Sequence, residues 1–320
     1  MNQTRTPPFT REQIRQLTQR SNWRGAWAVF STWALIAASF ALLATWTNPL
    51  TFIVALVLLG GRQLALAILQ HEAAHGTLFK NRRANRLIGD WLCARPIWLK
   101  LENYRLHHMK HHKDTGVQGD PDLSLTAPFP GTSRSLRRKL LRDISGLTGL
   151  KFLLGWVLMD AGVLKWTVSA DMEKLPQDGR RWYHYVRDFC VNAAPTLIVN
   201  AALFGILAAS GHAWLYAVWV LAYLTPYPLF LRIRSIAEHA CLDASRDPYR
   251  NTRTTRAGLL ARLTVAPMHV NYHLEHHLLA SVPYWNLPKM HRMLRDQGRV
   301  AAPPGYLEVL RLAGSAPASA

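Results

Sequence analysis

Two long stretches without a charged side chain constrain the fold of this 320-residue chain more than any other feature. Residues 26–61 and 189–231 contain no Asp, Glu, Lys or Arg. A helix needs about 20 apolar residues to cross the hydrocarbon core of a bilayer, so each stretch can form two spans joined by a short turn. We predict spans at 26–46, 50–70, 189–210 and 213–231. We prefer this interpretation to the alternative, which is a set of buried core helices in a large soluble protein.

The distribution of basic residues orients these spans. Neither predicted turn, 47–49 or 211–212, contains Lys or Arg, whereas the segment between the two hairpins contains many, including the run Arg137, Arg138 and Lys139. Basic residues mark the cytoplasmic side of a membrane protein. We therefore expect a multi-pass protein of a bacterial inner membrane, with both termini in the cytoplasm. The formal net charge of +19 fits contact with anionic lipid, and the basic residues form no recognisable nucleic-acid module, so we expect no nucleic-acid partner.

This topology divides the chain into six segments. A cytoplasmic amphipathic segment, 1–25, precedes the first transmembrane hairpin, 26–70. The cytoplasmic segment 71–188 contains a short apolar run at 152–159 that cannot cross a bilayer and that we assign to the membrane interface. The second hairpin, 189–231, leads to a cytoplasmic segment, 232–310, and a disordered tail, 311–320. The predicted fold class is all-α: a membrane protein with four transmembrane helices in two hairpins and a cytoplasmic helical cap that holds a histidine-ligated di-metal site.

Eight of the 14 histidines fall into three clusters: two in HEAAH, three in HHMKHH, where His107 is not counted, and three in HLEHH. Side chains at positions i, i+3 and i+4 of a helix lie on one face, so each cluster presents its imidazoles in one direction. A ninth candidate follows the fourth predicted span, in a helix that we expect Pro226 and Pro228 to kink. With four spans, all nine lie on the cytoplasmic side and can converge. The nine are His71, His75, His108, His111, His112, His239, His273, His276 and His277.

Nine imidazoles are too many for one metal ion and suit two. Imidazole binds zinc, iron, copper and nickel alike, but a catalytic zinc needs only about three protein ligands and an open position. Two irons with open positions could reduce dioxygen and remove hydrogen from an unactivated carbon, a reaction that protein acid–base groups cannot perform alone. The clusters thus indicate a redox di-metal site.

At this point the chain resembles the membrane fatty acid desaturase superfamily. Its members carry three histidine boxes, H-x(3,4)-H, H-x(2,3)-H-H and H/Q-x(2,3)-H-H, in the order found here. The segment NYHLEHHLLASVPYWNLPKMH around the third box and the DPDL segment (residues 120–123) after the second are also similar to many members. The resemblance extends from about residue 26 to residue 295.

The resemblance implies a non-haem centre of two irons, dioxygen as co-substrate and an acyl-lipid substrate that gains a carbon–carbon double bond. It implies that the nine histidines are iron ligands, and that electrons come from a separate donor of the ferredoxin or cytochrome b5 type. Some members have Asn one turn before the histidine that matches His239, whereas this chain has Ser235 there. Asp120 and Asp122 belong to the DPDL segment. Each is either a partner of a ligand or a simple loop carboxylate.

Several alternatives remain open from the residues alone. A hydroxylase or ketolase of a fatty acid, sphingolipid or carotenoid would use the same boxes. HEAAH also matches the H-E-x-x-H motif of zinc metalloproteases, in which Glu72 would be the general base, and a histidine-rich metal transporter is a third class. Outside the predicted set, His107 is an alternate ligand beside the second box, His269 precedes the third box by one turn, and His291 is expected at a solvated or interfacial position.

Overall fold

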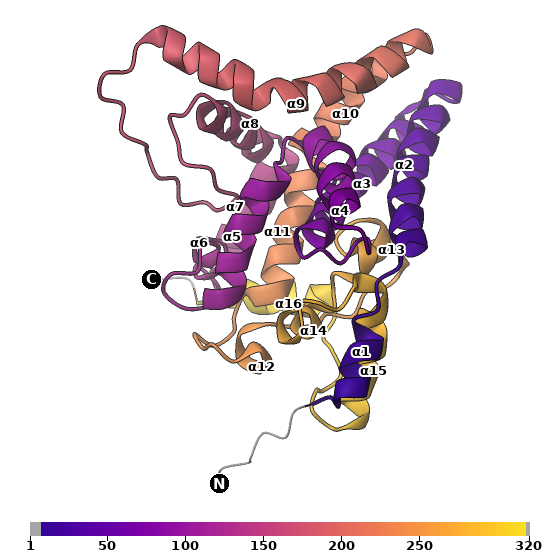
Figure 1. The fold of residues 1–320 in the computed structure, drawn as a ribbon, viewed down its shortest axis with the longest axis vertical. Coiled ribbons are helices and arrows are strands. Elements are labelled where there is room, and N and C mark those ends of the chain that lie inside the picture. The colour runs from indigo at the N-terminus through magenta and orange to yellow at the C-terminus, as the bar shows by residue number, and fades with distance from the viewer. Residues whose placement is uncertain (1–7, 318–320) are drawn as a thin grey trace.

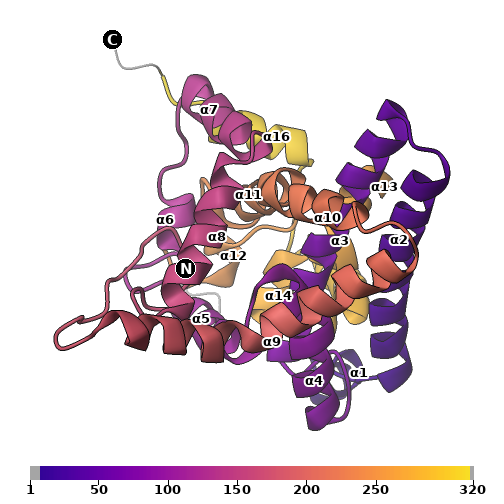
Figure 2. The same ribbon diagram turned by 90° about the horizontal axis from the view of Figure 1, so that it is seen from above.

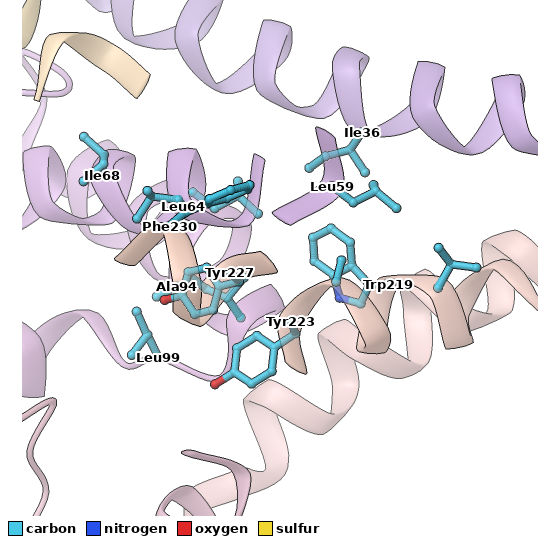
Figure 3. Packing of buried hydrophobic residues seen from close by; sticks show 14 of the residues in the cluster. Ile36, Leu59, Leu64, Ile68, Ala94, Leu99, Trp219, Tyr223, Tyr227 and Phe230 are labelled. Carbon is cyan, nitrogen blue, oxygen red and sulfur yellow. The ribbon is translucent and has the colours of Figure 1, made fainter. Parts of the chain in front are cut away.

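The second half of helix α3 (Pro49–Ala74) forms the centre of the molecule. The computed structural model describes residues 8–317, and in it α3 packs against α2 (Asn22–Thr45), α10 (Leu215–Leu224) and α11 (Pro226–His239). Nearly every residue of α3 from Leu59 to Ala74 is buried, whereas Leu50, Ile53 and Val54 at its start are exposed. Figure 3 shows Leu59 and Leu64 of α3 beside Trp219 and Tyr227 of α10 and α11.

Two glycines permit this packing. A Cβ on Gly60 would lie 2.6 Å from Pro226 Cγ, and one on Gly61 would lie 2.1 Å from the carbonyl oxygen of Leu263. The adjacent Arg62 donates hydrogen bonds from Nη2 to the carbonyl oxygens of Arg262 and Leu263, at 3.3 and 2.9 Å. Because Gly60 and Gly61 lack a side chain, α3 can lie close to α11, which carries His239, and to the C-terminal segment, which carries the third histidine box.

The first predicted hairpin matches α2 and α3. Asn48 caps α3: its side chain accepts hydrogen bonds from the backbone N–H groups of Leu50 and Thr51, and the Thr51 side chain completes a capping box. Proline at the first position of a helix is favourable because that position needs no N–H donor, so Pro49 fits the start of α3. The predicted turn at 47–49 therefore has a local chemical cause.

The second predicted hairpin differs in part. Helix α9 (Trp182–Ala209) covers the third predicted span, but the fourth is divided, because α10 ends at Leu224 and α11 begins at Pro226. Proline lacks the N–H group that would continue the preceding helix, and the expected interruption is confirmed. Three helical stretches among residues 8–317 are long and apolar enough to cross a membrane: Arg11–Thr45, which includes α1 (Arg11–Leu17), Pro49–Ala74 and Trp182–Ala209.

Shorter helices cover the C-terminal ends of α3 and α11. In Figure 1 the α2–α3 and α9–α10 turns lie at one end of the molecule, and α12, α14, α15 and α16 lie toward the other. Between the hairpins the chain forms α4 (Arg82–Ile88), η1 (Gly89–Ala94), η2 (Arg95–Ile97), α5 (Leu101–Asp114), α6 (Leu123–Thr126), α7 (Ser133–Ile144) and α8 (Leu147–Asp160). After α11 it forms α12 (Pro248–Asn251), α13 (Leu259–Leu263), η3 (Pro267–His269), α14 (His273–Leu278), η4 (Tyr284–Asn286), α15 (Leu287–Asp296) and α16 (Tyr306–Ala313).

The part of the chain that the structure describes is helical, apart from four isolated β-bridges. The all-α prediction is therefore confirmed for residues 8–317. Helix α16 packs against α7 and α11 (Figure 2), and the backbone of Gly131 bonds to Ala313 and Ala316. Part of the segment that we expected to form a disordered tail, 311–317, is thus ordered, while residues 318–320 lie outside the described residues.

Candidate metal centre

The nine histidines of the predicted set lie together in two adjacent groups. Within each group, one potential ligand atom from every residue lies within 4.8 Å of the others, so each could hold a metal ion. The rings of His112 and His277, one from each group, stack with their centroids 4.3 Å apart. Group 1 is His71, His75, His108, His112 and His276, and group 2 is His111, His239, His273 and His277.

The helix ends bring these residues together. His71 lies in the last turn of α3 and His75 at its C-terminal cap, whereas His239 is the last residue of α11. Helices α5 and α14 carry the H-x-x-H-H boxes. Each of these boxes is divided between the groups: α5 contributes His108 and His112 to group 1, and His111 to group 2. One helix therefore serves two sites.

The spacing of the ring nitrogens fits metal ligands. His112 Nε2 lies 3.0 Å from Nε2 of both His108 and His276. In group 2, His273 Nε2 lies 2.8 Å from His239 Nε2 and 3.0 Å from His277 Nε2. Two nitrogens at about 2.1 Å from one ion stand about 3.0 Å apart when the angle at the metal is 90°, and about 3.4 Å apart at a tetrahedral angle. The observed distances match the smaller angle.

The opposite nitrogen of several rings bonds outward, which fixes the ring orientation. His111 Nδ1 lies 2.8 Å from Asp120 Oδ1, and His239 Nδ1 donates to the carbonyl oxygen of Asn251 at 3.1 Å. His277 Nδ1 lies 3.3 Å from the Thr115 hydroxyl. A histidine that donates from Nδ1 has its lone pair on Nε2, and such outer partners are typical of histidines that bind metals.

Carboxylates lie near two further rings, those of His273 and His71. His273 Nδ1 lies 3.4 Å from Glu238 Oε1, and His71 Nδ1 lies 3.5 Å from Glu72 Oε1. Glu72 also accepts hydrogen bonds from the Thr77 hydroxyl at 2.8 Å and from the Tyr284 N–H at 3.1 Å. Glu72 is therefore held beside His71, although no hydrogen bond joins its carboxylate to that ring.

Burial lowers the pKa of most of these imidazoles and leaves some of their nitrogens without partners. Burial, together with the neighbouring histidines, lowers the pKa of His108 well below its usual value and that of His239 to about 3. Both nitrogens of His71 and Nε2 of His75 are buried and make no hydrogen bond within the described residues. Buried polar atoms are rarely left unsatisfied, and metal ligands must be deprotonated. The donor set therefore fits bound metal ions.

His111 is an exception among the ligand candidates. Burial alone would lower its pKa, but the hydrogen bond to Asp120 and the charges of Asp122 and Asp120 outweigh it and raise the pKa. The bond to His111 likewise holds the pKa of Asp120 below its usual value against the effect of burial. Asp120 is thus an ionised partner of a group 2 histidine rather than a simple loop carboxylate.

Three further histidines near the boxes belong to neither group. His107 Nε2 pairs with Asp122 Oδ1 at 2.8 Å, and His269 lies outside both groups. The expectation of a solvated His291 is wrong, because its side chain is buried and its Nδ1 lies 2.7 Å from Glu275 Oε1. Amphipathic helix α15 directs His291 inward, a position that the residue type alone does not reveal.

A cavity of about 850 Å³ leads to both groups. Its walls include His108 of group 1 and His111, His239 and His273 of group 2. Helix α8 contributes apolar side chains to the same cavity, among them Phe152, Trp156 and Met159, and α11 contributes residues spaced three or four positions apart. A molecule in this cavity would contact these apolar side chains and histidines of both groups at once.

Sequence reasoning missed two residues of the cavity wall, Arg234 and Glu238. Arg234 Nε donates to Glu238 Oε1 at 2.7 Å, and both residues line the cavity. The available signal was their spacing, because an arginine and a glutamate four residues apart in a helix face one another, and Glu238 immediately precedes His239.

Comparison with known proteins gives consistent results. A family model described as "Fatty acid desaturase" matches residues 47–306. The chain is 28% identical to a dihydrorhizobitoxine desaturase from Bradyrhizobium elkanii, over 94% of this chain and 85% of that protein. It is 26% identical to a beta-carotene ketolase from Paracoccus sp. (strain PC1), over 81% of this chain and 84% of that protein. A second beta-carotene ketolase, from Paracoccus sp. (strain N81106 / MBIC 01143), is 27% identical over the same shares.

Proposed function

From the premise that the chain belongs to the fatty acid desaturase family, we propose that it is an integral-membrane, dioxygen-dependent desaturase that introduces a carbon–carbon double bond into a fatty acid or the acyl chain of a lipid. The family and the relatives make the chain an oxidoreductase. In our proposal, group 1 and group 2 each hold one iron, with all nine histidines as ligands. Iron bound there would supply the redox chemistry that activates dioxygen and removes hydrogen from an unactivated carbon.

The observation that carries the proposal is the common cavity. Histidines of both groups and the apolar face of α8 line the same space. The buried aromatic and aliphatic side chains of that face would exclude water from a bound methylene. The outer partners Asp120, Asn251 and Thr115 would keep the ring nitrogens aimed at the ions without adjustment during the reaction. The residues of this chain would therefore hold the ring nitrogens in position and exclude water from the bound substrate.

Iron accounts for the donor set better than zinc. Structural zinc sites are almost always tetrahedral with four ligands, whereas group 1 offers five histidines. The nitrogen separations of 2.8–3.0 Å also favour angles near 90° over tetrahedral ones. Bound Fe, rather than Zn, is the expected result of metal analysis on purified protein.

The zinc protease and the metal transporter are both less well supported. In a protease Glu72 would face a metal-bound water, but here it is buried and bonded to Thr77 and Tyr284. In a transporter the ligands would lie near the middle of the spans, whereas His71 and His239 lie at the inner ends of α3 and α11. Neither residue arrangement suits those activities.

Topology and partners complete the proposal. We infer four membrane helices in two hairpins, with α10 and the start of α11 as the fourth, and a cytoplasmic cap that holds the metal centre. The protein would lie in a bacterial inner membrane and receive electrons from a separate ferredoxin or cytochrome b5 type donor. The exposed apolar side chains of α9, among them Val191, Ile198 and Ile206, are consistent with lipid contact.

Ketolation or hydroxylation is a second candidate, because two of the relatives are named beta-carotene ketolases. After removal of one hydrogen, loss of a second hydrogen gives an alkene, whereas transfer of oxygen gives an alcohol and, on repetition, a ketone. The histidine groups are the same for both outcomes. The position of the substrate in the cavity would decide between them.

The test is mass spectrometry of lipids and carotenoids from cells that express the wild type or His112→Ala. Products that have lost two hydrogens support desaturation, and products that have gained oxygen support the second candidate. Both should disappear in the variant, since His112 bridges two other ring nitrogens of group 1. An unchanged product profile from a chain that contains two irons would refute both activities on these substrates.

A further inference from the structure

We propose that Arg234 makes the inner end of the cavity a binding site for a substrate carboxylate, so that the reacting carbon stands a few bonds from that carboxylate. This inference rests on the proposed function and deepens it, because it narrows the substrate to carboxylates that enter the cavity with the charged end toward the metal centre. A plain methylene chain at this end would not satisfy the side chains found there.

The guanidinium of Arg234 has unused donors. Its side chain is 12% exposed, and the residue lines the cavity. Nε donates to Glu238, but neither Nη1 nor Nη2 makes a hydrogen bond with any described residue. The two nitrogens are not among the fully enclosed unpaired atoms of the molecule. They are therefore accessible to whatever occupies the cavity.

The position of Arg234 links these donors to the metal centre. Glu238 Oε1 lies 2.7 Å from Arg234 Nε and 3.4 Å from His273 Nδ1 of group 2. Tyr227, Leu231, Arg234 and Glu238 follow one another at intervals of three or four residues, and all four line the cavity. On this face of α11, the Glu238 carboxylate lies between the Arg234 guanidinium and His273 of group 2.

Two tyrosines extend the polar surface around the guanidinium. The hydroxyls of Tyr104 and Tyr227 make no hydrogen bond with a described residue, and both residues line the cavity. The Tyr104 ring stacks on His108 with a centroid separation of 5.2 Å. Hydroxyls and a guanidinium fork are donors suited to a carboxylate. The neighbouring Asp120 and Asp122 are already bonded to His111 and His107.

Desolvation explains why this end selects a carboxylate. Glu238 pairs with Nε of the Arg234 guanidinium but leaves Nη1 and Nη2 without acceptors, and donors that lose water without gaining an acceptor are unfavourable. Methylenes packed against Nη1 and Nη2 would displace water and provide no acceptor. A carboxylate replaces that water with two charge-assisted hydrogen bonds.

Three other cations from α7 and α8 also line the cavity: Lys139, Arg142 and Lys151. An anionic headgroup bound there would point its chain inward. Arg142 and Lys151 are exposed, however, and exposed cations contribute little to binding because water and salt screen them. The buried guanidinium of Arg234 is the stronger site for a carboxylate, and the two positions can be tested separately.

The experiment compares two probes of equal chain length, decanoate and decan-1-ol, on the iron-loaded full-length chain in nanodiscs. Calorimetric titration should give at least about tenfold tighter binding of decanoate to the wild type. Arg234→Lys retains a cation for Glu238 but lacks the guanidinium fork, so decanoate binding should weaken about 10- to 100-fold while decan-1-ol binding does not change. The matched control is Lys139→Gln/Arg142→Gln/Lys151→Gln, which should bind decanoate within about twofold of the wild type.

Equal binding of both probes to the wild type would overturn the inference. So would unchanged decanoate binding in Arg234→Lys, or a loss confined to the triple variant. A further measurement needs no variant: decanoate, and not decan-1-ol, should protect Arg234 of the wild type from phenylglyoxal, with the adduct located by peptide mass spectrometry. A chain with two irons that does not distinguish the probes refutes only this inference, whereas a chain that binds no iron refutes the proposed function and the inference with it.

Discussion

Replacement of Asp120 by Asn should weaken one of the two metal sites and leave the other intact. Asp120 Oδ1 lies 2.8 Å from His111 Nδ1, and its Oδ2 accepts from the Gly116 N–H at 2.9 Å. An asparagine can accept through one atom only, because its NH₂ group is a donor. The variant therefore loses the charge of the His111 bond and the hydrogen bond from Gly116.

The magnitude follows from these two losses. A hydrogen bond to a charged group contributes about 1.5–3 kcal/mol and a neutral one about 1 kcal/mol. The change at the His111 bond is the difference between these two values, about 0.5–2 kcal/mol, which corresponds to a decrease of about 2- to 30-fold in metal affinity. Loss of the bond from Gly116 also loosens the loop that holds residue 120, so we expect about 10- to 100-fold in total, the usual effect of removing an outer partner of a histidine ligand.

The assay is a titration of metal-free protein with Fe²⁺ under anaerobic conditions in the presence of a competing chelator, which resolves two binding steps. Only the step that belongs to group 2 should weaken in Asp120→Asn. Asp122→Asn is the comparison variant. Its charge also acts on His111, but its nearest oxygen lies 3.8 Å from His111 Nδ1 and its hydrogen bond goes to His107, outside both groups, so this variant should weaken the group 2 step less than Asp120→Asn does. Equal weakening of both steps, or equal effects of the two variants, would refute the division of the histidines into two sites.

Three further outcomes are expected. His112→Ala should reduce the iron content from about two to about one per chain by elemental analysis, because His112 lies 3.0 Å from His276 in group 1; two irons in the variant would argue against that assignment. Removal of iron by a chelator should lower the melting temperature, since a ligand at 100 times its Kd stabilises the folded state by about 2.7 kcal/mol, and Fe²⁺ but not Zn²⁺ should restore activity. Gly61→Ala should destabilise the protein by at least about 1–3 kcal/mol, because its Cβ would lie 2.1 Å from the oxygen of Leu263, whereas Gly205→Ala, in a helix with open space around it, should be neutral or stabilising. Equal melting temperatures for these two glycine variants would contradict the close packing of α3.

Some features of the fold could be predicted because they are local. The absence of charge over 26–61 predicts two helices, and Asn48 with Pro49 marks the boundary between them through capping chemistry that involves only adjacent residues. Pro226 interrupts its helix because it lacks an N–H group, whatever surrounds it. The three boxes likewise indicate the family without knowledge of the fold, and the family assignment is confirmed.

Other features depend on contacts between distant segments. The residue type of His291 does not reveal whether its side chain is solvated or buried. Only the packing of α14 beside α15 gives it Glu275 as a partner. The sequence does not explain why Arg62 interrupts an apolar helix. The tertiary structure does, because it places the carbonyl oxygens of Arg262 and Leu263 beside the Arg62 guanidinium. Arg234 faces the cavity because α11 begins at Pro226 and presents one particular face to it.

The histidines show the same division between local and long-range features. The local sequence was enough to place the imidazoles of each box on one helix face, because the spacing of three and four residues is a property of any α-helix. The assignment of His111 and His112, which are adjacent on one helix, to different groups required the packed structure. His112 Nε2 meets His276 Nε2 across 164 positions of sequence, and such a contact depends on how whole helices pack, which the local periodicity of the chain does not encode.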